Sequence, residues 1–105
     1  MIQGDVCSYT FKEPDKRRPV LILTRNAAIP NLTSITVAQI TTSMRDIESV
    51  VWLDRSDGVL TECVVNLDNI QTVPKHGLGK VMTHLSDERM REIFKAIRFA
   101  FNFDK

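Results

Sequence analysis

Residues 86–101 read SDERMREIFKAIRFAF, and this segment divides the chain into two kinds of structure. Its apolar residues recur at helical spacing and form one stripe: Met90, Ile93, Phe94, Ile97, Ala100 and Phe101. Ser86 stands at the position of an N-cap, and two acidic residues follow in the first turn, where they complement the positive end of the helix dipole. We predict an amphipathic helix over residues 87–101, with its phenylalanine-rich stripe packed in the core.

The chain before this helix alternates in the manner of β-strands and is rich in β-branched residues. The predicted strands cover residues 4–11, 19–23, 35–42, 49–53 and 62–67, with two further short strands at 71–73 and 80–84. Residues 12–18 (KEPDKRR) are polar throughout and contain Pro14, which predicts a loop. Many short strands followed by one helix predict a mainly β fold, a small and strongly curved antiparallel sheet or barrel with the helix laid across it.

The length and composition indicate one soluble globular domain. A chain of 105 residues can bury about 65% of its surface in a single core, so we expect one domain over residues 1–105. Apolar residues make up 43% and charged residues 26%, which argues against a disordered, fibrous or membrane protein. The longest apolar runs, such as residues 20–23, are too short to span a bilayer, and no secretory signal is visible. We expect a cytoplasmic protein without a membrane partner.

The formal net charge of +1 conceals a segregation along the chain. Residues 1–45 carry six Lys or Arg and three Asp or Glu (+3), residues 46–72 carry one and six (−5), and residues 73–105 carry seven and four (+3). A nearly neutral chain can therefore present a local basic face to a polyanion, although the same counts also fit a solvated surface of mixed charge.

The motifs of most catalytic and metal-binding sites are absent from the sequence. There is no GxxxxGK[ST] phosphate loop, and residues 77–79 (GLG) lack the strand and helix context of a dinucleotide site. His76 and His84 fit no zinc-binding pattern, and no GxSxG motif supports a Ser-His-Asp site, although one sequence leaves such a site open. The spacing of Cys7 and Cys63 leaves a disulfide open, and we expect both to be reduced core residues. An enzyme with this sequence is expected to use no metal and no nucleotide cofactor.

Two segments carry polar groups that suit a phosphate. Lys16, Arg17 and Arg18 lead into the strand that begins at Pro19, and a guanidinium fixed there can engage two phosphate oxygens at once. Residues 39–43 (QITTS) form a hydroxyl-rich strand end, and hydroxyls can donate to a phosphate oxygen. Either segment alone also fits an ordinary surface.

Taken together, these segments resemble the MazF/PemK toxins. The matching segments, in order, are residues 4–6 (GDV), 18–20 (RPV), 38–42 (AQITT), 64–73 (VVNLDNIQTV) and 84–86 (HLS). The resemblance covers nearly the whole chain. It implies an SH3-like small β-barrel of the MazF, PemK and CcdB type with a C-terminal helix. It also implies a sequence-specific endoribonuclease toxin that requires neither a metal nor another cofactor.

The resemblance implies catalytic roles for Arg18, Thr41 and Glu13. Arg18 directly precedes the Pro-Val of its strand, as the family's catalytic arginine does, and Thr41 follows Gln-Ile, as its catalytic threonine does. Glu13 lies five positions before Arg18, where relatives often have an acidic residue. The expected reaction is attack by the ribose 2′-hydroxyl on the adjacent phosphorus. Cys7-Ser8, Asn26 and Gln71 depart from the family pattern and affect the expected substrate preference and dimer contacts.

RNA contacts are expected in the loops. Single-stranded bases are held by stacking and by hydrogen bonds to their edges, and the 2′-hydroxyl distinguishes RNA. The residues expected to bind RNA are Lys12, Lys16, Arg17, Arg25, Thr42, Ser43 and Arg45. Residues 43–49 are expected to border the bases, and Trp52 either stacks on a base or belongs to the core.

The resemblance also implies two protein partners. The first is a cognate antitoxin whose acidic, partly disordered segment lies over the basic groove. The second is another copy of the chain, in a homodimer built from residues 64–72 and the helix face. The alternative is a non-catalytic toxin or binding module on the same barrel, such as a gyrase inhibitor, since fold does not dictate function. Arg18 and Thr41 distinguish the two readings, because a gyrase inhibitor needs neither.

Overall fold

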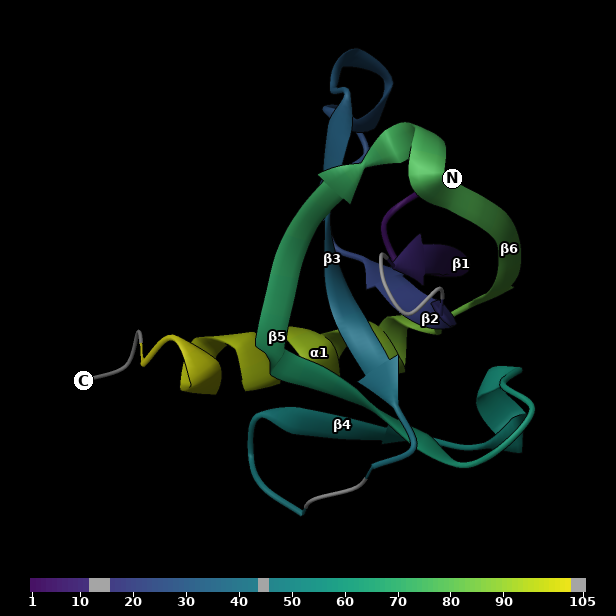
Figure 1. Cartoon of the computed structure of the whole chain (residues 1–105). Helices are drawn as coiled ribbons and strands as arrows, with labels where there is room; N and C mark the ends of the chain where they lie inside the picture. Colours follow the sequence, from purple (N-terminus) through teal and green to yellow (C-terminus); the bar gives the residue numbers. More distant parts are fainter. Residues whose placement is uncertain (12–15, 44–45, 103–105) are drawn as a thin grey trace.

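The chain folds into one antiparallel sheet with a helix across it (Figure 1). The computed structural model describes residues 1–11, 16–43 and 46–102, without the side chain of Lys16. The strands are β1 (Asp5–Phe11), β2 (Lys16–Ile22), β3 (Ser34–Thr41), β4 (Val50–Leu53), β5 (Cys63–Pro74) and β6 (Leu78–His84), and the helix is α1 (Asp87–Ala100). In the described part of the chain, three short 3-10 helices connect them: η1 (Ile29–Asn31), η2 (Arg55–Asp57) and η3 (Lys75–Gly77). The mainly β fold with a C-terminal helix is as predicted.

The sheet is open within the described residues. Its strand order is β4-β5-β3-β2-β1-β6, and every neighbouring pair is antiparallel. Strands β4 and β6 form the two edges and are not paired with each other. The expected SH3-like barrel is therefore barrel-like at most, a curved sheet without closure.

Strand β5 is one long strand, where the sequence predicted two short ones. Its first half pairs with both β4 and β3, and its second half pairs with β3 alone. The β3–β5 register shifts between Ala38, which pairs with Ile70, and Gln39, which pairs with Asn66. Extra residues on one strand form a bulge, which bends that strand while hydrogen bonding continues on either side. The bulge residues read as a strand break in the sequence.

Strand β2 also begins earlier than predicted. Arg17 and Arg18 belong to the strand and lie opposite Thr10 and Tyr9 of β1. The polar composition of this segment indicated a loop, but pairing with β1 satisfies the backbone groups whatever the side chains are. Arg18 therefore lies inside the β1–β2 hairpin, where pairing with β1 fixes its backbone.

Hydrophobic side chains pack on both faces of the sheet. The larger cluster, beneath α1, includes Val6, Leu21, Ile40, Val51, Leu53, Val65, Leu67, Met90 and Ile93. The smaller cluster, on the other face, comprises Cys7, Val20, Ile22, Ile29, Ile35, Val37 and Val73. Neighbouring residues of one strand alternate between the two clusters, as the pleat requires. Both cysteines are free and buried, in agreement with the expected reduced core residues.

The helix begins where predicted, but its aromatic residues do not lie in the core. The Ser86 hydroxyl accepts a hydrogen bond from the backbone N–H of Arg89 at 3.1 Å, which makes Ser86 the N-cap. The buried stripe centres on Ile93 and includes Ala96, so Phe94 lies at its rim and is 43% exposed. Phe101 lies past the end of the helix and is also exposed. The prediction that the phenylalanine-rich stripe is core was wrong for both. Among the described residues, no helix is long and apolar enough to cross a membrane.

Truncation at Ile93 should therefore cost far more stability than truncation at Phe94. Ile93 is fully buried, and Ile93→Ala is expected to lower the free energy of unfolding by about 2–5 kcal/mol, because it leaves a cavity. Phe94→Ala is expected to cost about 1 kcal/mol or less, since its ring is already half in solvent. Urea unfolding of both variants measures the difference, and equal losses would contradict this assignment of the helix face.

Candidate functional site

Arg18 and Thr41 come together at one end of strands β2 and β3. The β2–β3 register pairs Val20 with Gln39, and continuing it by two residues places Arg18 opposite Thr41. Residues opposite each other in antiparallel strands project from the same face. Both side chains line one cavity of about 340 Å³. Arg18 and Thr41, which are far apart in the sequence, thus come together at one cavity, as expected.

The cavity has a polar wall and an apolar wall. Strands β2 and β3 provide the polar wall with Arg17, Arg18, Thr41 and Thr42. Residues 59–61, which follow η2, and Met82 of β6 provide the other wall, which is largely apolar. None of the described residues that line the cavity is acidic. Such a cavity can accept an anion at its polar wall and an apolar group beside it.

The position of the Thr41 hydroxyl is set by its own backbone. Its oxygen accepts a hydrogen bond from the N–H of Ser43 at 3.1 Å, in a local turn at the end of β3. The hydroxyl hydrogen is not used in that bond. Thr41 can therefore donate to an anion while its oxygen is held by the turn.

Cys63 also lines the cavity but is unsuited to nucleophilic attack. Burial raises the pKa of the Cys63 thiol, and the nearby charge of Asp57 raises it further. A thiol with a raised pKa stays protonated at neutral pH and is a poor nucleophile. The candidate chemistry therefore rests with Arg18 and Thr41.

The other predicted site residues are distributed as follows. Arg17 and Thr42 line the cavity and are exposed, and Ser43 follows them at the surface. Arg25 is exposed beyond the far end of β2 and is not among the residues that line the cavity. Three further predicted residues, Lys12, Glu13 and Arg45, lie outside the described residues, as does the side chain of Lys16.

Trp52 is not a core residue. It is 37% exposed on β4, where it lies opposite Val64 of β5. Its ring borders a separate hollow with Phe99 of α1, on the far side of β5 from β3. The core alternative for Trp52 was wrong, and its side chain is accessible from solvent.

A chain of amides next to the site was missed in the sequence. Gln39 lies two residues before Thr41 on β3, so both project from the same face. The side-chain amide of Asn69 donates to the Gln39 side-chain oxygen, and Gln71 donates in turn to Asn69 at 3.3 Å. This contact depends on the bulge of β5, which no local sequence signal indicated. The amide chain extends the polar surface away from Arg18 and Thr41.

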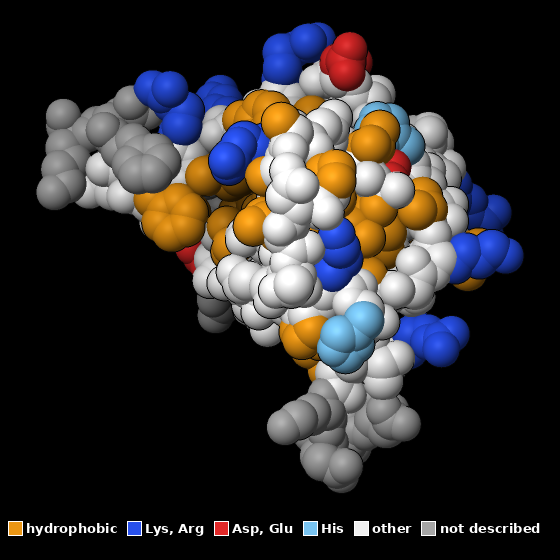
Figure 2. Space-filling view, turned by 90° about the horizontal axis from the view of Figure 1, so that it is seen from above, with side chains coloured by type: hydrophobic (Ala, Val, Ile, Leu, Met, Phe, Trp, Pro, Cys, Tyr) orange, Lys and Arg blue, Asp and Glu red, His pale blue; other side chains and the backbone are white. Residues whose placement is uncertain are grey.

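Charge and apolar surface are mixed on the face in Figure 2. Lys and Arg side chains stand around exposed hydrophobic side chains there, and few acidic ones are visible. Over residues 1–11, 16–43 and 46–102, no three His, Cys, Asp or Glu side chains gather in an arrangement that could hold a metal ion.

Known proteins with similar sequences and folds share one family. Residues 2–101 match the family described as PemK-like, MazF-like toxin of type II toxin-antitoxin system. Endoribonuclease MazF3 of Mycobacterium tuberculosis is 42% identical over 90 residues, which are 86% of this chain and 87% of that protein. The probable endoribonuclease MazF5 of the same organism is 41% identical over 85 residues, 80% of this chain and 78% of that protein.

Solved structures agree with this relationship. The M. tuberculosis toxin MazF-mt6 superposes with a TM-score of 0.88 at 37% identity, covering 96% of this chain and 99% of that one. A mycobacterial endoribonuclease in complex with its cognate antitoxin superposes with a TM-score of 0.89 at 26% identity, covering 100% of this chain and 98% of that one. The sequence match over nearly the whole chain and the shared fold lead to one conclusion: the chain belongs to the family of PemK-like and MazF-like toxins of type II toxin–antitoxin systems.

Proposed function

We propose that the protein is a sequence-specific endoribonuclease toxin that cleaves single-stranded RNA with Arg18 and Thr41 and without a metal ion. Its relatives carry the name endoribonuclease. The observation that supports the roles of the two residues is that they line one cavity that has no acidic side chain among its described residues. The phosphodiester would lie against the polar wall of this cavity.

The proposed reaction is a transesterification within the RNA. The ribose 2′-oxygen forms a bond to the adjacent phosphorus, and the bond from phosphorus to the 5′-oxygen of the next nucleotide breaks. The 2′-hydroxyl loses a proton and the leaving oxygen gains one, so the first products carry a 2′,3′-cyclic phosphate and a 5′-hydroxyl. Negative charge builds up on the phosphoryl oxygens during the attack, and fixed donors aimed at them lower the barrier.

Arg18 acts chiefly as an electrostatic clamp in this proposal. Its planar guanidinium can hold two phosphoryl oxygens, and the Thr41 hydroxyl can donate to one of them. A guanidinium holds its proton tightly and is a poor general base, so proton transfer by Arg18 is secondary. Glu13 remains a candidate catalytic carboxylate.

The remaining polar residues would bind the RNA on either side of the cleaved bond. Lys12, Lys16, Arg17, Arg25 and Arg45 would neutralise phosphates, and Thr42 and Ser43 would donate hydrogen bonds. Contacts of this kind make binding depend on salt concentration.

We further propose that the protein works as a cytoplasmic homodimer controlled by a cognate antitoxin. A structural neighbour with the same fold was solved in complex with its cognate antitoxin. An acidic antitoxin segment over the polar wall would compete with RNA for the same cations.

Removal of the Arg18 side chain should nearly abolish cleavage. Loss of one preorganised donor typically costs roughly 10²–10³ in rate, and we expect Arg18→Ala to fall in this range. Arg18→Lys should recover little, because an ammonium lacks the planar fork. The assay is cleavage of a labelled single-stranded RNA, with circular dichroism to show that the variants fold. Arg91→Ala, at an exposed helix position, is the matched control, and wild-type rates in Arg18→Ala would exclude the assignment.

The Thr41 hydroxyl should matter more than the shape of the side chain. Thr41→Val keeps the branched shape but removes the donor, and we expect its rate to fall about 10²-fold. Thr41→Ser keeps the hydroxyl and should retain most of the activity. The same RNA assay compares the two, and similar rates for Val and Ser at this position would contradict a donor role.

Cleavage should persist when metals are removed. We expect the purified protein to cut single-stranded RNA equally well with and without excess EDTA, since charge stabilisation comes from side chains. Sequencing of the cut ends identifies the recognition sequence. No cleavage of any RNA, together with inhibition of supercoiling by gyrase, would favour the non-catalytic alternative instead.

A further inference from the structure

The apolar wall of the cavity contains a strongly exposed leucine. Leu60 is 83% exposed, although it lies in the loop of residues 54–62 that ends at buried Cys63. Its neighbour Val59 is buried in the core, so the loop is anchored immediately before Leu60. An exposed leucine on an anchored loop beside a cationic wall provides a fixed apolar surface for a ligand.

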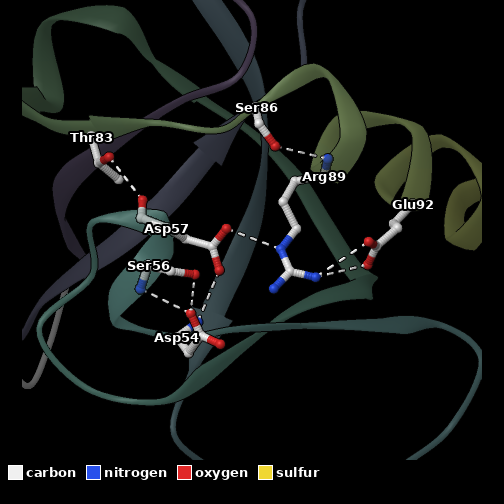
Figure 3. Close-up of polar contacts among 7 residues, drawn as sticks. All are labelled: Asp54, Ser56, Asp57, Thr83, Ser86, Arg89 and Glu92. Carbon is white, nitrogen blue, oxygen red and sulfur yellow. Dashed lines mark hydrogen bonds and ion pairs between the residues drawn. The ribbon is translucent and has the colours of Figure 1, made fainter.

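Polar contacts from outside the cavity hold this loop (Figure 3). The Arg89 guanidinium of α1 donates through Nε to the Asp57 carboxylate at 2.9 Å. The Thr83 hydroxyl of β6 donates to the backbone carbonyl of Asp57 at 2.9 Å. Asp54 and Asp57 cap η2 by accepting hydrogen bonds from backbone N–H groups of the same turn. Asp57 is therefore the point at which helix, edge strand and loop meet.

The ion pair is partly removed from water, which makes it a firm attachment. The Asp57 side chain is 8% exposed and that of Arg89 is 25% exposed. The hydrogen bond to Asp57 raises the pKa of Arg89, so Arg89 keeps its charge at every physiological pH. Glu92, the second acidic partner of Arg89, is more exposed and contributes less.

Gly58 allows the loop to approach β6 closely. Its φ of +92° is in the left-handed region, and a Cβ built on it would lie 2.2 Å from the Thr83 hydroxyl oxygen. Any larger residue would push the loop away from Thr83, just before Val59 and Leu60. A glycine at this position therefore lets the loop lie directly against the Thr83 side chain of β6.

We propose that Arg89 and Asp57 are positioning residues that hold Leu60 against the ribose and base next to the cleaved phosphate. This inference rests on the proposed function. Arg18 and Thr41 lie on the paired strands β2 and β3, and neither Arg89 nor Asp57 belongs to those strands. The Arg89–Asp57 ion pair therefore affects how RNA is held, and leaves the donors to the phosphate in place. The Leu60 side chain offers no hydrogen bond. It therefore favours a nucleotide whose apolar ring face packs against it.

The test compares Leu60→Ser, Arg89→Gln and the double variant. Each single change should raise KM for a short single-stranded RNA about tenfold and leave kcat within about threefold, because loss of the apolar contact of one leucine reduces affinity by about this factor. The KM of the double variant should be no higher than that of the more impaired single variant, since both changes act on the same wall of the cavity. Leu32→Ser, an exposed leucine distant from the cavity, is the matched control.

Salt dependence separates positioning from direct phosphate binding. Arg89→Gln should leave the slope of log KM against log salt concentration unchanged, because Arg89 is engaged by Asp57. A slope smaller by about 0.7 would mean that Arg89 neutralises a phosphate itself, and would overturn the proposal. Gly58→Ala perturbs the same contact by a different route and should raise KM in the same way.

Three further results would overturn the inference. Unchanged KM in Leu60→Ser would exclude a contact with RNA, and this exposed position can be tested even if Arg89→Gln fails to fold. A change in subunit assembly of Leu60→Ser, measured by sedimentation, would assign the leucine to an interface between copies. If the wild-type chain cleaves no RNA, both this inference and the proposed function fail, whereas wild-type cleavage with unchanged variants removes this inference alone.

Discussion

The antiparallel pairing of β2 with β3 is the constraint on which the candidate site depends. The register that pairs Val20 with Gln39 also determines that Arg18 and Thr41 project from one face. A slip of one strand by one residue would turn the side chains of that strand to the opposite face and so separate Arg18 from Thr41. The register itself is fixed by burial, since Val20 and Leu21 must enter different hydrophobic clusters. The same register therefore packs the core and places Arg18 beside Thr41.

Strand β5 and the helix complete this arrangement from the other side. The bulge after Asn66 lets β5 pair with β3 on either side of it, while the first half of β5 also pairs with β4. Residues 59–61, which lead into β5, line the same cavity as the ends of β2 and β3. Helix α1 buries Ile93 against the sheet and directs Arg89 to the loop of residues 54–62. The helix thus serves stability through its apolar stripe and the cavity through its polar side.

The sequence predicted those parts of the fold that depend on local patterns. Strand alternation, the helical stripe and the Ser86 cap require only neighbours along the chain, and the structure contains all three. The parts that were missed depend on distant partners. Arg17 and Arg18 lie in a strand because β1 pairs with them, and Phe94 is exposed because the helix turns Ile93 and Ala96 toward the sheet.

The same distinction applies to the site. Arg18 and Thr41 were found through the family resemblance, and the structure brings them to one cavity. The amide chain from Gln39 to Gln71 and the Arg89–Asp57 pair join segments with no common motif. The loop of residues 54–62 lies between β4 and β5, outside the paired strands, so an exposed side chain such as Leu60 can vary without disturbing the pairing of β2 with β3. Duplicated genes can therefore diverge at this exposed position, while the placement of Arg18 beside Thr41 is inherited intact.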